Sequence, residues 1–199
     1  MQFKIKNTKI TISFTFFALI ILLIVFNKNE FLYLTCFFAI IHELAHLVAL
    51  NKSGVVINEL KISLFGANIK IENYKKTSTK NEIIILLAGV TANLLFAVLL
   101  YVINYFVKSE LVKNMFLINL SLSLFNLLPF YNFDGGKIIE LLLKTKLNEK
   151  TADILISCIS FVVLIPIIFV SINVFLQNHN NFYFLVVSVL MLLTIILKK

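Results

Sequence analysis

Six apolar runs, each about as long as a helix that crosses a lipid bilayer, constrain this chain more than any other feature of its sequence. A membrane-spanning helix needs roughly 20 predominantly apolar residues. The chain of 199 residues is 60% hydrophobic, so little sequence remains outside the runs. We therefore expect an all-α polytopic membrane protein, a single membrane-embedded domain over residues 1–199 with no separate soluble domain. The predicted spans are 10–27, 31–50, 82–107, 112–130, 152–176 and 181–197.

The lysines predict which side of the membrane each loop faces. The net charge is +8, and all 18 basic residues are lysines. With six spans, 15 of them fall on the side that holds both termini and the loops 51–81 and 131–151. Cytoplasmic loops carry the excess of Lys and Arg, so we expect a multi-pass protein of the cell membrane with both termini in the cytoplasm. No basic patch gathers on a folded domain, so no nucleic-acid partner is expected.

Two stretches on the predicted cytoplasmic side have regular patterns. Apolar and polar residues alternate from Glu59 to Glu72 around Gly66-Ala67-Asn68, which predicts a small β-hairpin with its turn at the glycine, between the second and third spans. Apolar residues mixed with charges from Gly136 to Leu147 predict a short helix at the membrane interface.

The second run contains three ionisable residues in the stretch "FFAIIHELAHLVAL", residues 37–50. His42 and His46 are four residues apart, so on a helix they share one face and both imidazoles can reach one metal ion. Glu43 lies beside the pair and can accept a proton from a metal-bound water. This His-Glu-x-x-His pattern is typical of zinc hydrolases. The alternative is that the three side chains form hydrogen bonds between membrane helices.

A catalytic zinc ion needs a third protein ligand besides two histidines and a water molecule. His179 lies in a loop predicted to face the other side of the membrane, so we expect it to be solvated. Asp134 follows the fourth run at the same depth as the histidine pair, and Pro129 and Gly135-Gly136 would break the helix and turn the chain there. Asp134 is thus either the third ligand or an ordinary turn residue. Asp153 is expected to be a carboxylate at a helix start.

The His-Glu-x-x-His motif, "NLLPFYNFDGG" at residues 126–136 and "AGVTAN" at residues 88–93 together resemble the site-2 protease family of intramembrane metalloproteases. Within that family the chain is similar to the branch of stage IV sporulation protein FB, which has six spans with the zinc motif in the second. The chain ends at Lys199 without the CBS domain of that branch, and it has Val90 where the family often has proline after the glycine.

The resemblance implies a role for each matching residue. His42, His46 and Asp134 would bind Zn²⁺, and Glu43 would be the catalytic acid and base. Asn126 would line the active site and help to position the substrate or stabilise the oxyanion.

Asn93 matches the family motif in the third span. It would line the active site or form hydrogen bonds between helices, and the two readings stay open.

The resulting functional hypothesis is an intramembrane zinc endopeptidase. It would cut a membrane protein or a membrane-associated pro-protein near the cytoplasmic side of the bilayer, as in regulated intramembrane proteolysis and in the processing of sporulation sigma factors. The lipid bilayer and regulatory membrane proteins are the other expected partners. Two alternatives remain at this stage, which are a catalytically silent membrane scaffold and a transporter that uses these residues as a metal or proton relay.

Overall fold

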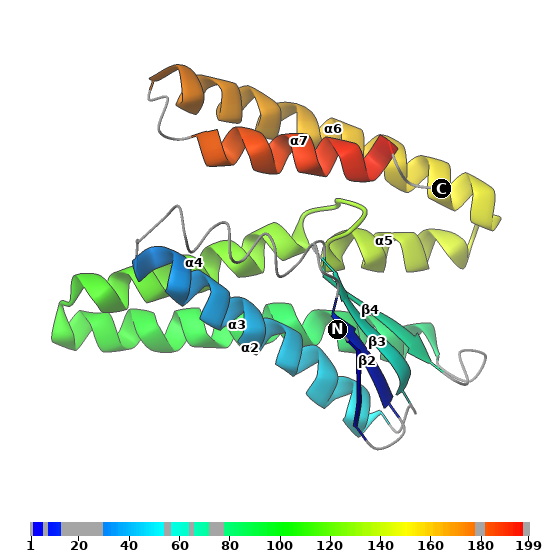
Figure 1. Cartoon of the computed structure of the whole chain (residues 1–199), viewed down its shortest axis with the longest axis horizontal. Coiled ribbons are helices and arrows are strands. Elements are labelled where there is room, and N and C mark those ends of the chain that lie inside the picture. Colours follow the sequence, from blue (N-terminus) through cyan, green and yellow to red (C-terminus); the bar gives the residue numbers. More distant parts are fainter. Residues whose placement is uncertain are drawn as a thin grey trace. The chain divides into compact units, whose positions relative to one another are not determined.

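The computed structural model describes residues 2–5, 8–12, 30–53, 57–63, 66–71, 78–177 and 182–196 (Figure 1). The chain divides into two compact units, Met1–Asn126 and Leu127–Lys199. Each unit is described by itself.

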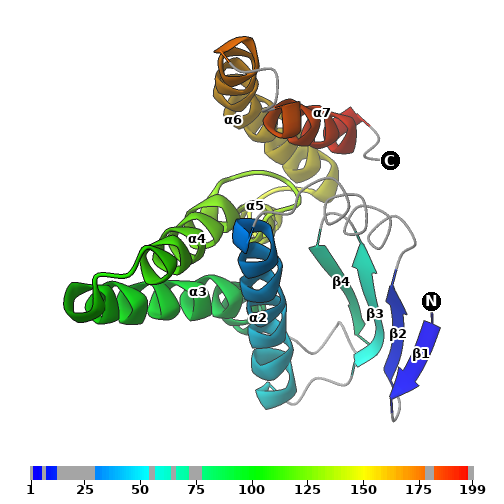
Figure 2. The same ribbon diagram turned by 60° about the vertical axis from the view of Figure 1, so that its left-hand side comes forward.

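The first unit contains a four-stranded sheet of order β1-β2-β3-β4, whose strands lie side by side in Figure 2. Strand β1 pairs antiparallel with β2, β2 pairs parallel with β3, and β3 pairs antiparallel with β4. The parallel pairing joins Lys9 to Glu59 and Ile12 to Ile62, which are about 50 residues apart in the chain. The strands are β1 (Gln2–Ile5), β2 (Thr8–Ile12), β3 (Ile57–Ser63) and β4 (Gly66–Ile71).

The expectation of an all-α protein is therefore wrong, because the described residues include this four-stranded sheet, and three candidate spans rather than six are found among them. The predicted hairpin between the second and third spans is present as the antiparallel pair β3–β4. The predicted first span, 10–27, begins inside β2, and residues 13–29 lie outside the described part of the chain. The segment of alternating residues belongs to the larger mixed sheet. Gly66-Ala67-Asn68 lies within β4, and Gly66 pairs with Ser63, so the turn does not fall at that tripeptide.

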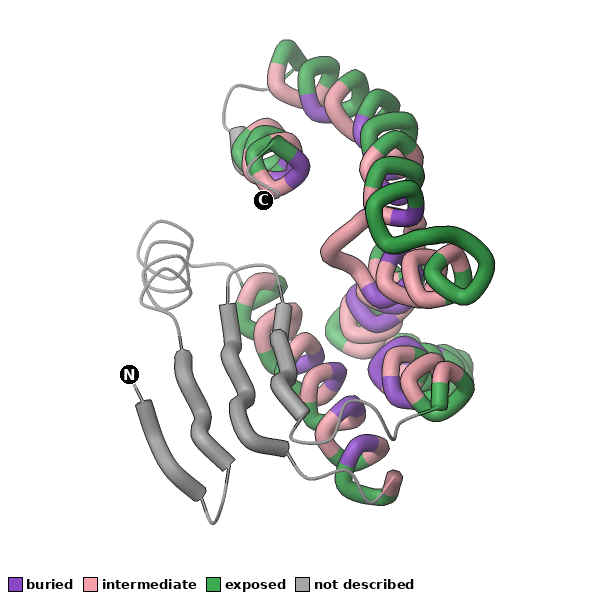
Figure 3. Tube along the Cα trace, turned by 90° about the vertical axis from the view of Figure 1, so that its right-hand side faces the viewer, coloured by how far each residue is buried: buried purple, intermediate pink, exposed green. Residues whose placement is uncertain are grey.

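Three helices complete the first unit: α2 (Glu30–Lys52), α3 (Thr79–Val107) and α4 (Glu110–Leu127). The buried residues of α2 recur every four positions, at Phe38, His42, His46 and Leu50. Helix α3 buries Ile85, Gly89, Asn93 and Ala97 with the same spacing, and the two helices pack against each other. Rows of residues at i and i+4 form ridges that interdigitate between helices. Figure 3 colours the buried positions of the described helices purple.

The second unit consists of α5 (Asp134–Lys144), α6 (Glu149–Gln177) and α7 (Phe182–Ile196). Helix α6 packs against both α5 and α7. The core of this unit is formed by Phe130, Leu164, Met191 and Ile195. Phe130 belongs to the connection between α4 and α5, so that connection is anchored in the core.

Three of the described helices are long and apolar enough to cross a membrane: α2, α3 and α6. Helix α7 has 15 residues and is shorter than the bilayer core, because a helix rises about 1.5 Å per residue and the core is about 30 Å thick. Helix α4 has 18 residues and a lower mean hydropathy, with Glu110, Lys113 and Asn114 in its first turns. The described residues therefore support a membrane protein, with fewer clear spans than the sequence predicted.

Candidate metal centre

The two histidines of α2 direct their Nε2 atoms toward each other. His42 and His46 are buried, and their Nε2 atoms lie 3.1 Å apart. Two ligands at about 2.0–2.1 Å from a tetrahedral zinc ion are separated by about 3.3–3.4 Å. The pair therefore needs only a small adjustment to bind one ion through both Nε2 atoms, as the spacing of four residues predicted.

The imidazole of His46 is oriented by the backbone of α3. Its Nδ1 lies 2.8 Å from the carbonyl oxygen of Ile85. A carbonyl can only accept, so Nδ1 carries the proton and donates it, and Nε2 keeps its lone pair. Metal-binding histidines commonly hold their second ring nitrogen in this way. No residue pattern predicts this contact, because the partner is a backbone atom.

Gly89 allows α3 to approach both imidazoles. A Cβ atom at this position would lie 2.5 Å from Nε2 of His46 and 2.7 Å from Nε2 of His42. Any side chain at position 89 would therefore occupy the space in front of the two Nε2 atoms. Gly89 and Asn93 are four residues apart, so both lie on one face of α3.

Asn93 lies on the other side of Gly89 and is fully buried. Its Nδ2 is 3.4 Å from Nδ1 of His42. The structure thus brings Asn93 of α3 to His42 of α2, a contact that fits both readings of this residue, as a lining residue and as a hydrogen-bond partner between helices.

In the second unit, Asp134 is the first residue of α5 and is buried. The backbone N–H of Tyr131 donates to Oγ of Ser160 at 2.8 Å, and this bond holds the segment before Asp134 against α6.

Gly135 and Gly136 do not form the expected turn, because both lie in the first turn of α5. A Cβ atom on Gly135 would clash with the backbone of Leu127, and one on Gly136 with the backbone of Phe130. The glycines therefore allow close backbone packing at the start of the helix that carries Asp134.

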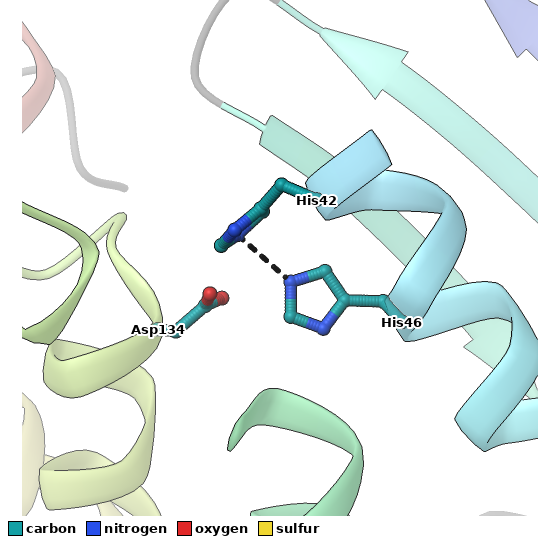
Figure 4. Close-up of side chains that lie close together, drawn as sticks. All are labelled: His42, His46 and Asp134. Carbon is teal, nitrogen blue, oxygen red and sulfur yellow. Dashed lines mark hydrogen bonds between the residues drawn. The ribbon is translucent and has the colours of Figure 1, made fainter. Parts of the chain in front are cut away.

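Figure 4 draws the imidazoles of His42 and His46 on α2, with the dashed line between their facing nitrogen atoms. Asp134 on α5 is a further residue with a side chain of the type that binds metal ions, and all three side chains are buried. Two imidazoles and one carboxylate are a donor set that zinc uses in catalytic sites.

The remaining predicted residues have different surroundings. Glu43 is half-buried and lies next to His42 on α2. Asn126 is half-buried, and its Nδ2 donates to the carbonyl oxygen of Leu122 on its own helix at 3.0 Å. His179 lies outside the described residues. Asp153 is the fifth residue of α6 and pairs with Lys144 at 3.4 Å, so it is not a helix-start carboxylate.

A polar cluster joins α5 to α6 and includes Asp153. Nζ of Lys144 contacts Glu140 at 2.6 Å as well as Asp153. Burial lowers the pKa of Lys144, but its hydrogen bond with Glu140 and the two negative charges outweigh that effect and raise the pKa. Burial and the charges of Glu140 and Asp153 raise the pKa of Tyr131, with Lys144 acting in the opposite direction. Tyr131 therefore stays protonated and Lys144 stays charged at neutral pH.

Comparisons with known proteins gave matches to peptidases. The model of peptidase family M50 matches residues 30–109 and 107–167. A zinc metalloprotease of Methanocaldococcus jannaschii is 27% identical over 156 residues, which are 72% of this chain and 45% of that protein. The chain thus spans less than half the length of that relative. The solved structure of a site-2 protease from the same organism has a similar fold, with a TM-score of 0.67, 23% identity and coverage of 96% of this chain and 91% of the other.

Proposed function

Because the chain belongs to peptidase family M50, we propose that it is an intramembrane zinc endopeptidase. It would hydrolyse a peptide bond of a membrane protein or membrane-associated pro-protein near the cytoplasmic side of the bilayer. The observation that carries the proposal is the convergence of the Nε2 atoms of His42 and His46 on a helix long enough to span a membrane. Two buried imidazoles face each other at this distance when a proton or a cation lies between them.

The proposed ligands of the zinc ion are His42, His46 and Asp134. Three protein ligands leave the fourth position of a tetrahedral site for water or substrate, which is the arrangement of catalytic zinc sites. When bound, zinc lowers the pKa of its water to about 7 and polarises the scissile carbonyl group.

Glu43 moves the proton in this proposal. It adjoins His42 and is half-buried, so its carboxylate can reach the same space without taking a ligand position. The carboxylate takes the proton of the attacking water and delivers it to the leaving amide nitrogen. Asn126 stays a proposed lining residue, whose amide would have to leave the carbonyl of Leu122 to donate to the substrate.

The expected setting is the cell membrane, with both termini in the cytoplasm and regulatory membrane proteins as further partners. The lysines that flank the span α3 support this orientation, because six lie in residues 51–81 before most of the helix and only Lys108 and Lys113 follow it before α4 continues. A role in sporulation, through the processing of a sigma-factor precursor, is the most specific form of the proposal and is supported by the motifs shared with stage IV sporulation protein FB.

The proposal is tested by replacing Glu43 with glutamine, which keeps the size of the side chain and removes the proton acceptor. General acid–base assistance contributes about 10²–10⁴-fold to a rate, so Glu43→Gln should cut at least about 100-fold more slowly while keeping its zinc. Quantitative proteomics of membrane fractions from cells with each variant would show which proteins stay uncut.

Glu110→Gln is the matched control, because Glu110 is an exposed carboxylate at the start of α4. Identical fragment patterns for Glu43→Gln and Glu110→Gln, with zinc retained in both, would rule out the protease function. The scaffold and transporter hypotheses predict that outcome.

A further inference from the structure

The amide of Asn93 points toward another helix, unlike the amides of three other asparagines in the described helices. Asn119, Asn126 and Asn173 each donate Nδ2 to the carbonyl oxygen four residues earlier on their own helix. Asn93 instead directs its amide across to His42 on α2. Its Oδ1 is buried and has no hydrogen-bond partner among the described residues. A buried acceptor without a partner is costly, so this amide needs an explanation.

The two orientations of the amide correspond to the two tautomers of the neutral His42 ring. With Nδ2 toward His42, the amide donates to Nδ1, and the ring proton is on Nε2, which faces His46. Rotation of the amide by 180° places Oδ1 at this position instead. Oδ1 then accepts a proton from Nδ1, and Nε2 of His42 presents a lone pair. Only the second state leaves Nε2 able to bind a cation.

The neighbouring histidine is already held in that state. The carbonyl oxygen of Ile85 accepts the Nδ1 proton of His46, eight residues before Asn93 on the same face of α3. Gly89 lies midway between these two acceptors and leaves room for both rings. One face of α3 therefore offers an acceptor to Nδ1 of each histidine.

We propose that Asn93 is a positioning residue for the metal centre, because its Oδ1 accepts the Nδ1 proton of His42 and so directs the Nε2 lone pair at the metal ion. This inference rests on the proposed function, since it presupposes a metal ion bound by His42 and His46. Hydrogen-bond partners of this kind fix the tautomer and the ring orientation of a ligand, and their loss typically lowers metal affinity about 10–100-fold.

The test is the zinc affinity of purified full-length variants, measured by competition with a chromophoric chelator. Asn93→Leu keeps a similar volume and offers no acceptor, so its affinity should fall about 10–100-fold. Asn93→Asp offers only acceptor oxygens and should bind zinc at least about ten-fold more tightly than Asn93→Leu. Asn104→Leu is the matched control. Asn104 lies on the same helix, about three turns after Asn93, so this variant should bind zinc as the wild type does.

Equal affinities of Asn93→Leu and the wild type would overturn the inference. So would equally weak binding by Asn93→Asp and Asn93→Leu, since that result is expected if the amide donates to His42 or only packs.

A second measurement needs no substitution at position 93. ¹⁵N NMR of the zinc-loaded wild type should show His42 protonated at Nδ1, and a proton at Nε2 would contradict the proposal. If the wild type binds no zinc, or if His46→Ala binds as tightly as the wild type, the proposed function fails instead.

Discussion

At the scale of single residues, the candidate metal centre depends on the lack of a side chain at position 89, where α3 faces the two histidines. Gly89 lies in the buried stripe of α3, and a Cβ atom there would lie 2.5 Å from Nε2 of His46 and 2.7 Å from Nε2 of His42. Either the imidazoles or the helices would have to move apart. Overpacking a well-packed interior costs about 1–3 kcal/mol, so the substituted protein should still fold with a damaged site.

We therefore expect Gly89→Ala to lose most of its zinc while its helical content is unchanged. The measurement is metal content per chain together with circular dichroism of the purified protein. Thr91→Ala changes an exposed residue of the same helix and should retain its zinc. Full zinc content in Gly89→Ala would show that α3 does not approach the histidines as closely as described here.

Residues with a characteristic spacing could be predicted from the sequence, and residues defined by a contact could not. The positions of His42 and His46 follow from helical periodicity alone. The role of the Ile85 carbonyl carries no sequence signal, because every residue has a carbonyl group. The contact of Asn93 with His42 depends on how far α3 is shifted along α2, which is set by packing between residues about 50 positions apart.

At the scale of elements, the segment between α4 and α5 determines where Asp134 lies. Helix α4 ends at Leu127, two residues before Pro129, as expected from the restriction that proline places on the residue before it. The segment is then fixed by Phe130 in the core and by the bond from the Tyr131 N–H to Ser160. Ser160 accepts this bond while donating to the carbonyl oxygen of Ile156 on its own helix.

Ser160→Ala should therefore lower the stability of the second unit, because the Tyr131 N–H loses its partner at a cost of about 1–3 kcal/mol. Ser171→Ala is a matched control on the same helix, since Ser171 is also buried and its Oγ donates to the carbonyl oxygen of Ile167. Thermal unfolding in detergent should give a lower midpoint for Ser160→Ala than for Ser171→Ala. Equal midpoints would mean that the bond to Tyr131 contributes nothing measurable.

The four-stranded sheet could be predicted only in part, because the alternating pattern indicated β3 and β4 but not β1, β2 or the pairing of β2 with β3. The apolar run that begins at Ile10 continues the strand Thr8–Ile12, so hydropathy assigned its first residues to a span. The pairing of β2 with β3 joins segments about 50 residues apart. A local sequence pattern cannot predict a parallel pairing between segments so far apart. The helical regions were predicted well because each apolar run of α2, α3 and α6 is long and continuous.

At the scale of the whole molecule, the lysine asymmetry and the span α3 make a joint prediction about topology. Lys80 lies in the first turn of α3 and Glu110 follows its end, so the two exposed residues should lie on opposite sides of the membrane. In a background without Cys36 and Cys158, Lys80→Cys should resist a membrane-impermeant thiol reagent applied to intact cells, and Glu110→Cys should react. The reverse pattern would invert the orientation, and equal reactivity would show that α3 does not cross the membrane.

The central claim is that His42, His46 and Asp134 together hold one zinc ion, and the metal content of matched variants tests it most directly. The chain has three histidines and two aspartates, so each proposed ligand type has a control of the same type at His179 or Asp153. The wild type, Glu43→Gln, His179→Ala and Asp153→Ala should each carry about one zinc ion per chain, as a mononuclear site requires. His46→Ala and Asp134→Ala should carry much less. A zinc-free wild type, or full zinc content in Asp134→Ala, would contradict the account.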